Sequence, residues 1–245
     1  MIKITIEAGR IMFDLESLII GVILIIKKYT CIDIKIHAES NDDDYKNGIV
    51  LLPLVGLAIG FAASFISSFK IFYDDFFISA VVLSYYCIIT KTVNLRDTYR
   101  TLNYIIKPKN QSEQISGTIG MIIICLFYFS LIRIVDVTAV LMMPVAGYSG
   151  LIILSMVFDR NKNGTSVIKY CDRYHSLSAF GISFALAVVI NYKLVIPLSL
   201  TYMISGLVVN ILDKKIKLLP NSIEGFIIEI TQLIFLIFTY IFKIT

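Results

Sequence analysis

The sequence predicts an all-α, polytopic membrane protein, and its composition, its long apolar blocks and the placement of its basic residues all indicate this class. Hydrophobic residues make up 57% of the 245-residue chain and charged residues 16%, against roughly 45–50% and about 25% in an ordinary soluble domain. The mean hydropathy is +0.82. A soluble domain of this size needs more polar surface than so few charges provide. The composition therefore excludes a soluble enzyme, a nucleic-acid-binding module, a disulfide scaffold and a disordered chain.

The N-terminal segment, residues 1–47, is predicted to lie on the cytoplasmic face or in the membrane interface. Its apolar run covers only residues 18–26 and ends at Lys27 and Lys28, whereas a membrane span needs about 20 apolar residues. The basic pair follows the apolar run and no small-residue cleavage site comes after it, unlike the arrangement in a signal peptide. We expect an interfacial or re-entrant helix here.

Seven apolar stretches, each nearly free of charge, account for most of residues 48–245. They are continuous and lack the period-two alternation of a transmembrane β-strand. Small residues such as Gly56 and Gly206 are scattered through them, as helix packing in lipid favours. We therefore expect about seven transmembrane helices in a bundle, and a single integral membrane domain over residues 1–245. The predicted spans are residues 48–69, 76–93, 117–132, 137–158, 177–192, 194–212 and 223–242.

Basic residues are distributed unevenly over the segments between these spans. Eighteen of the 22 Lys and Arg residues lie in the N-terminal segment and in the segments after the second, fourth and sixth spans. The other ends of the spans hold only Lys70, Arg133, Lys193 and Lys243. The positive-inside rule places the richer side in the cytoplasm. We therefore predict a multi-pass protein of the cell membrane with a cytoplasmic N-terminus, cytoplasmic long loops and an external C-terminus.

Cysteine, histidine and the N-terminal acidic residues form no recognisable metal or redox motif. The four cysteines have no C-x-x-C spacing, so we expect no disulfide framework and no zinc site. We expect the two histidines on the surface, and the acidic run at residues 42–44 in a solvated loop. Motifs of phosphate-binding loops, zinc proteases and serine hydrolases are absent. The residues concerned are Cys31, Cys87, Cys125, Cys171, His37 and His175.

Two glutamates accompany the last predicted span, residues 223–242. Glu224 lies at its start, where a negative charge suits the helix dipole. Glu229 lies about two turns into the span, where an ionised carboxylate facing lipid is costly. We therefore expect Glu229 to face a cavity or a polar partner inside the bundle, or to be protonated.

Motifs along the chain resemble those of a known family, in the same order. Residues 51–60 read LLPLVGLAIG and residues 90–103 read TKTVNLRDTYRTLN. The first resembles the FPLVGLLIG opening of a membrane helix in cobalamin synthases (adenosylcobinamide-GDP ribazoletransferases). The second takes the place of that family's cytoplasmic loop, TGGLHLDGLADTADG. The family's D-S-R-I-G-A-Y-G, A-P-V-L-G-R and T-G-D-x-x-G-A-x-x-E-x-T-E motifs are echoed by residues 116–120, 143–148 and 220–232.

The resemblance implies a phosphotransferase of the cell inner membrane that acts in cobalamin biosynthesis. It would join adenosylcobinamide-GDP to α-ribazole, or its 5′-phosphate, and give cobalamin and GMP. Magnesium, held by carboxylates and substrate phosphates, is the expected cofactor of such a transfer. The catalytic positions carried over from the resemblance are Arg96, Asp97, Arg100, Asn103 and Glu229. The substrate-binding positions carried over are Thr90, Asn94, Ser116, Thr118, Gly120, Gly147, Ser222 and Gly225.

Most acidic positions of the family's motifs carry other residues in this chain. The matched residues that differ are Arg96, Arg100, Asn103, Ser116 and Ser222 in place of aspartate, Asn94 in place of histidine and Thr118 in place of arginine. Asp97 lies one residue away from a position that is aspartate in the family. Of the acidic motif positions that can be matched, only the one at Glu229 keeps its acid. An Arg in place of an Asp puts a positive charge at contact distance from the position of a cation. We therefore expect no protein metal ligands of the family's kind.

Arg96 and Arg100 lie four residues apart, so they share one face of a helix. Two guanidinium groups on one face are suited to binding a phosphate directly. The alternative is that both are ordinary positive-inside residues beside the end of a span.

Three functions remain open from the sequence. The first is ribazole transfer, as the resemblance implies. The second is a degenerate paralogue that kept the membrane fold and acts as a binding or scaffold protein. The third is an unrelated small transporter, which the lack of matching Gly/Pro-broken spans in two halves disfavours. Expected partners are the lipid bilayer and a corrinoid or nucleotide-phosphate substrate, with no nucleic acid. Association with itself or with other cobalamin-pathway proteins stays open.

Overall fold

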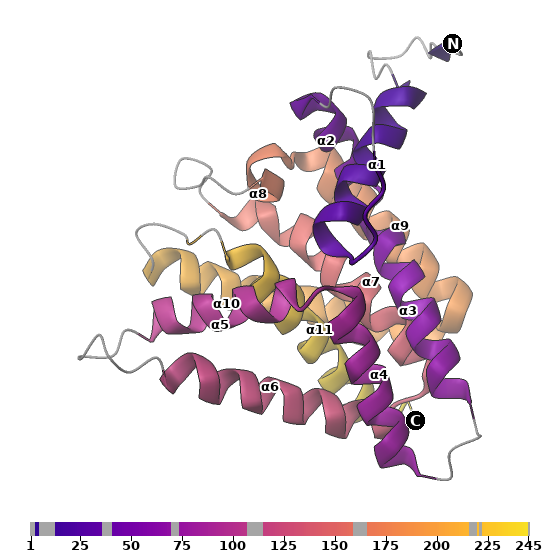
Figure 1. Cartoon of the computed structure of the whole chain (residues 1–245), viewed down its shortest axis with the longest axis vertical. Helices are drawn as coiled ribbons and strands as arrows, with labels where there is room; N and C mark the ends of the chain where they lie inside the picture. Colours follow the sequence, from indigo (N-terminus) through magenta and orange to yellow (C-terminus); the bar gives the residue numbers. More distant parts are fainter. Residues whose placement is uncertain are drawn as a thin grey trace.

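The structure is a computed structural model that describes residues 3–4, 13–35, 41–69, 74–106, 115–158, 166–215, 220 and 222–244. These residues form helices, apart from a pair of two-residue antiparallel strands, β1 (Lys3–Ile4) and β2 (Phe13–Asp14) (Figure 1). The α-helices are α1 (Leu15–Tyr29), α2 (Asp42–Ile49), α3 (Leu52–Ser68), α4 (Asp75–Ile89), α5 (Val93–Ile105), α6 (Ile115–Ile134), α7 (Val137–Leu154), α8 (Ser166–Tyr170), α9 (Arg173–Asn191), α10 (Val195–Lys215) and α11 (Ile223–Ile241). The prediction of an all-α fold is confirmed for this part of the chain.

Four stretches among the described residues are long and apolar enough to cross a membrane: Ser116–Ile134, Val137–Val157, Arg173–Lys214 and Ile223–Ile241. Two bent helix pairs pass the same test together, α2 with α3 at 57° and α4 with α5 at 86°, which raises the number to six. The protein is therefore membrane-spanning by the length and composition of its helices. The predicted seven spans are not confirmed, because α3 and α4 qualify only with their bent partners.

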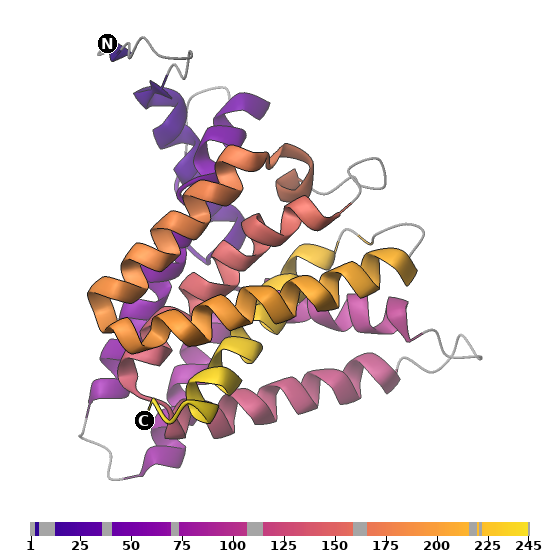
Figure 2. The ribbon, with the colours of Figure 1, turned by 180° about the vertical axis from the view of Figure 1, so that it is seen from behind.

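Two of the predicted spans, residues 177–192 and 194–212, fall within the single stretch Arg173–Lys214. This stretch contains α9, the short 3₁₀ segment η3 (Tyr192–Leu194) and α10. Figure 2 shows that the chain reverses at η3, so that α10 runs back alongside the bundle. The break in hydropathy at Lys193 therefore corresponds to a real turn.

Helix α7 lies at the centre of the bundle and contacts α3, α9, α10 and α11. Glycines allow its closest neighbours to approach. A Cβ at Gly60 of α3 would lie 2.0 Å from the carbonyl oxygen of Leu141, and one at Gly147 would lie 2.5 Å from the side chain of Gln232 in α11. Close backbone approach at small residues is how helices pack in lipid. Helix α7 thereby packs closely against both α3 and α11.

The short helix α1 packs against α2 and is not among the membrane-crossing candidates. A Cβ at Gly21 would lie 2.0 Å from the carbonyl oxygen of Asp44, so the two backbones touch. The acidic run at residues 42–44 is the first turn of α2, and the backbone N–H of Asn41 donates to Asp44 at 2.9 Å. The prediction of a solvated loop is therefore wrong for Asp44, which is buried as part of a capping box.

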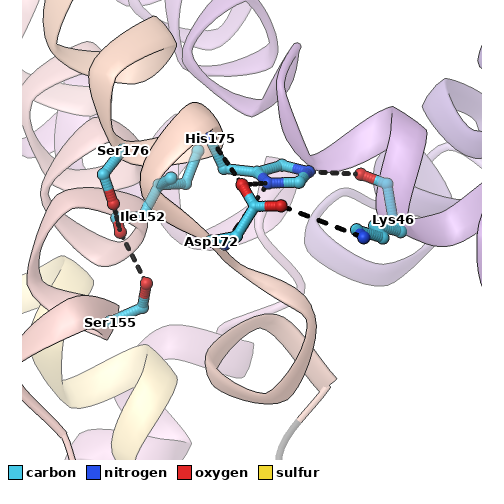
Figure 3. A network of polar contacts seen from close by, with 6 residues as sticks. All are labelled: Lys46, Ile152, Ser155, Asp172, His175 and Ser176. Atoms are coloured by element: carbon cyan, nitrogen blue, oxygen red, sulfur yellow. Dashed lines mark hydrogen bonds and ion pairs between the residues drawn. The ribbon is translucent and has the colours of Figure 1, made fainter. Parts of the chain in front are cut away.

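His175 joins the N-terminal hairpin, which α1 and α2 form, to α9 (Figure 3). Its Nε2 donates to the backbone carbonyl of Lys46 at 3.0 Å, and its Nδ1 lies 2.5 Å from the carboxylate of Asp172. Burial disfavours the charge of Asp172, but the hydrogen bonds from His175 outweigh it and hold the pKa of this carboxyl below its ordinary value. His175 is 4% exposed, so the prediction of a surface histidine is wrong there. His37 lies outside the described residues.

Ser155 and Ser176 form hydrogen bonds to the end of α7, next to the contact made by His175. Both hydroxyls donate to the carbonyl oxygen of Ile152, at 2.6 Å and 3.1 Å respectively. Figure 3 shows the two serines approaching Ile152 from different segments. The end of α7 and the start of α9 are thus tied together beside the His175 contact.

The polar segments lie at two ends of the bundle. They divide into the same two groups as in the prediction from the distribution of Lys and Arg. At one end, Asp136 donates its N–H to the carbonyl of Ile244 at 3.1 Å, and Asn191 donates to Thr138 at 3.1 Å. At the other end, the N–H of Cys31 donates to the carbonyl of Ile89 at the end of α4, Lys46 of α2 lies 3.9 Å from Asp172, and Lys28 of α1 lies 2.7 Å from Glu224. The side of the bilayer that each end faces stays a prediction.

Candidate functional site

The candidate site begins where α4 turns into α5, the segment that resembles the family's loop motif. Lys91 and Thr92 adopt left-handed backbone angles, with φ values of 51° and 52°. The hydroxyl of Thr90 donates to the carbonyl of Tyr86 at 2.8 Å and is buried. The chain therefore leaves α4 through a tight turn, and residues expected in a loop form a helix at 86° to it.

The polar residues of α5 divide between two faces. Asn94, Thr98 and Thr101 are buried, whereas Arg96 and Arg100 are exposed. The residues at each face recur at the three- and four-residue spacing of a helix. The predicted catalytic arginines therefore do not point into the bundle, and the predicted substrate residue Asn94 does.

Helix α11 begins directly against the buried face of α5. A Cβ at Gly225 would lie 2.6 Å from the Cβ of Asp97 and 2.9 Å from the Cα of Asn94. The hydroxyls of Thr101 and Ser222 lie 2.8 Å apart and are buried. The structure thus brings together the two motif segments that the sequence separates by more than a hundred residues.

Asn103 connects the end of α5 to the start of α6. Its Oδ1 accepts from the backbone N–H of Gly117 at 2.8 Å and from the hydroxyl of Ser116 at 3.1 Å. A Cβ at Gly120 would lie 2.5 Å from a leucine of α5, and Thr118 is exposed. These predicted substrate residues hold α6 beside α5, apart from the buried contact between α5 and α11.

Glu229 is fully buried at the centre of the bundle and receives two tyrosine hydroxyls. Tyr86 donates to its Oε1 at 2.8 Å, and Tyr128 donates to its Oε2 at 2.7 Å. The hydroxyl of Tyr128 also lies 3.1 Å from Oε1 of Gln232. These two tyrosine hydrogen bonds confirm the prediction that Glu229 faces a polar partner. Buried polar groups generally have such partners.

Asn94 extends this cluster towards α5. Its Nδ2 lies 3.5 Å from the hydroxyls of both Tyr86 and Tyr148. Gly147, the residue before Tyr148 in α7, makes room for Gln232. Residues of α4, α5, α6, α7 and α11 therefore meet around one carboxylate.

Glu224, five residues before Glu229, forms a second cluster that the sequence does not predict. Lys28 Nζ lies 2.7 Å from Glu224 Oε2 and 2.9 Å from the hydroxyl of Tyr45. Tyr29 donates to the same Oε2 at 3.1 Å, and the N–H of Val167 donates to Oε1 at 2.8 Å. Burial disfavours the charge of Lys28, but Glu224 outweighs it and raises the pKa of the ammonium above its ordinary value.

Positive side chains outnumber negative ones where α5 meets α11. Asp97 interacts with Arg96, Arg100, Glu224 and Lys28. The Arg96 guanidinium Nε lies 3.8 Å from the Asp97 carboxylate. Each of the two carboxylates therefore has a cation of the protein beside it.

This donor set does not fit a magnesium ion held in the family's manner. Mg²⁺ takes oxygen ligands and is bound through carboxylates. Asn103 and Ser222, at two positions where the resembling family has aspartate, use their side chains in hydrogen bonds within the bundle. In the part of the chain that the structure describes, no group of three or more His, Cys, Asp or Glu residues could hold a metal ion.

Comparison with known proteins assigns no family to the chain. No family model, no curated protein and no solved structure matches it. The cobalamin-synthase resemblance therefore stays a prediction that rests on the motifs and their order.

Proposed function

We propose that this chain is a non-catalytic membrane protein of the cobalamin-synthase lineage, which binds a ligand or partner and does not transfer ribazole. The observation that supports this most is the use of the former acidic positions. Asn103 and Ser222 bind neighbouring helices, while Arg96 and Arg100 carry positive charge on the outer face of α5. Phosphoryl transfer depends on positioning and on neutralising phosphate charge with metal ions. Of the positions that would hold such ions, two therefore serve helix packing and two carry a positive charge.

The internal cations support the same proposal. The Nζ of Lys28 forms an ion pair with Oε2 of Glu224 at 2.7 Å, and the guanidinium of Arg96 lies beside the carboxylate of Asp97. A divalent cation would have to displace both and would meet Arg100 as well. Mutual repulsion between like charges at such distances is strong in a partly buried site.

The exposed face of α5 supports binding of an anionic ligand. Arg96 and Arg100 are exposed and one helical turn apart. Guanidinium groups bind phosphate oxygens in a bidentate manner without a metal. A corrinoid precursor with a nucleotide diphosphate offers such phosphates, and it is the ligand class that the resemblance implies.

The catalytic part of the proposal is tested with purified protein, adenosylcobinamide-GDP, α-ribazole and magnesium. We expect no GMP and no cobalamin, with an active cobalamin synthase as the positive control. We also expect a well-expressed chain to leave a cobalamin-synthase knockout unable to grow on cobinamide and dimethylbenzimidazole. Magnesium-dependent release of GMP would overturn the proposal.

The binding part is tested by titrating adenosylcobinamide-GDP into the detergent-solubilised protein. Arg96→Ala with Arg100→Ala should weaken binding at least about tenfold, since two charge-assisted contacts are lost. Lys169→Ala with Lys214→Ala removes the same net charge from other exposed positions and should leave binding unchanged. Uptake of a labelled solute by proteoliposomes would instead favour a transporter.

A further inference from the structure

An apolar groove runs along the surface between α1, α3 and α4, at the same end of the bundle as the N-terminal hairpin. Its volume is about 340 Å³, within the range of roughly 300–1,000 Å³ that is typical of small-molecule sites. Thr30 and Tyr85 contribute the polar side chains of its wall. Apolar side chains form the rest, including Val22, Ile26, Ile32, Leu54, Ala58 and Ile89.

Two lysines lie close in sequence to residues that line this groove on α1 and α4. Lys27 follows the lining residue Ile26, and Lys91 comes two residues after the lining residue Ile89. The backbone N–H of Cys31 donates to the carbonyl of Ile89 at 2.6 Å, which ties the end of α1 to the end of α4. Lys27, in the last turn of α1, and Lys91, just after α4, therefore lie on segments that are held together.

Asp33 is a charged neighbour of both lysines. Lys27 Nζ lies 2.9 Å from the Asp33 carboxylate. The hydrogen bond and charge of Lys27, and in addition the charge of Lys91, hold the pKa of Asp33 below its ordinary value. All three side chains are exposed, and two positive charges against one negative leave this rim positive.

We propose that the groove binds one acyl chain of an anionic phospholipid, whose phosphate lies at Lys27 and Lys91. A membrane-spanning protein presents such an exposed apolar groove to lipid chains, and the charge at its rim is complementary to an anionic head group. Basic residues at the level of the head groups attract anionic lipids in this way. The proposal depends on the membrane location of the chain and is independent of the proposed ligand-binding function.

A second groove of similar size lacks this rim and provides a comparison. It lies along α6, has a volume of about 380 Å³, and is lined by Leu83, Met121, Ile122, Cys125, Leu126 and Phe129. No basic residue occurs within two positions of these lining residues in the sequence. Lipid chains at that groove should show no preference between head groups.

The test is a lipid titration of the detergent-solubilised protein, followed by native mass spectrometry. The probes are phosphatidylglycerol and phosphatidylcholine with identical acyl chains. We expect the unaltered protein to bind phosphatidylglycerol at least about tenfold more tightly. Lys27→Gln with Lys91→Gln should abolish this preference and leave phosphatidylcholine binding unchanged.

A matched pair of variants separates the groove from general surface charge. Lys169→Gln with Lys214→Gln lowers the net charge equally at exposed positions elsewhere and should keep the preference. Ala58→Phe fills the groove and should weaken both lipids, whereas Ala80→Phe, exposed on α4 outside the groove, should not. Equal affinity of the unaltered protein for both lipids, or a preference that survives in Lys27→Gln with Lys91→Gln, would overturn the proposal.

Discussion

Glu224 and Glu229 lie on the same helix, five residues apart, and the protein stabilises their buried carboxylates in different ways. Glu224 is 5% exposed and pairs with the ammonium of Lys28. Glu229 is 0% exposed and receives the uncharged hydroxyls of Tyr86 and Tyr128. At the polar end of the bundle, α1 supplies a cation, Lys28, whose side chain stays partly exposed to water. At the centre, a second buried charge would add its own desolvation cost, so neutral donors serve instead.

The largest effect expected from this comparison is that of Lys28→Met. This change leaves the buried Glu224 carboxylate without its cation. We expect a loss of about 2–4 kcal/mol in the free energy of unfolding, below the roughly 3–5 kcal/mol of a wholly buried pair, because 33% of the Lys28 side chain is exposed. Unfolding in detergent micelles measures it.

Two further variants sharpen this prediction. Lys27→Met breaks the exposed pair with Asp33 and should have no measurable effect on the free energy of unfolding, since water screens exposed ion pairs. The double change Lys28→Met with Glu224→Gln should recover part of the loss, since it removes both charges and keeps a side-chain oxygen that can accept from the N–H of Val167. Equal effects of Lys28→Met and Lys27→Met would contradict the role assigned to Glu224.

The next effect in size is that of Tyr128→Phe. It removes the hydroxyl that donates to Glu229 at 2.7 Å and leaves a buried carboxylate oxygen without that donor. We expect a loss of about 1–3 kcal/mol in the free energy of unfolding. Tyr192→Phe removes a hydroxyl from an exposed tyrosine, 72% accessible, and should have no measurable effect.

A smaller effect is expected for Glu229→Gln, about 1 kcal/mol or less. A tyrosine hydroxyl can accept as well as donate, so one of the two tyrosines can reorient towards the new amide. Glu224→Gln should cost more, because the ammonium of Lys28 has only donors to offer. If thermal unfolding ranks these two variants in the opposite order, the comparison of the two clusters fails.

The smallest effect is a dependence of stability on alkaline pH. The pKa of Lys28 is raised in the folded protein above its ordinary value of 10.5. Its contribution to stability is therefore fully present below 10.5 and is lost as the pH rises through the raised pKa. We expect the unaltered protein to lose more stability than Lys28→Met over that interval. Thermal unfolding of both proteins in alkaline buffers measures the difference.

The helical membrane class was predictable because hydropathy is a local property of the chain. The same holds for the short first helix, which ends where Lys27 and Lys28 interrupt the apolar run. The buried surroundings of Glu229 were also predictable, because a carboxylate inside an apolar span needs partners. The identity of those partners was not, since Tyr86 and Tyr128 lie 143 and 101 residues away in the chain.

Sequence alone thus determined the helical, apolar character of this protein and the grouping of its polar segments into two sets. Tertiary structure decided that residues 93–105 form a helix at 86° to α4, so that Arg96 and Arg100 face outwards. It also decided that Lys28 meets Glu224 across 196 residues of chain. Composition and periodicity report which side chains avoid water, and only the packing of distant helices determines which of them meet.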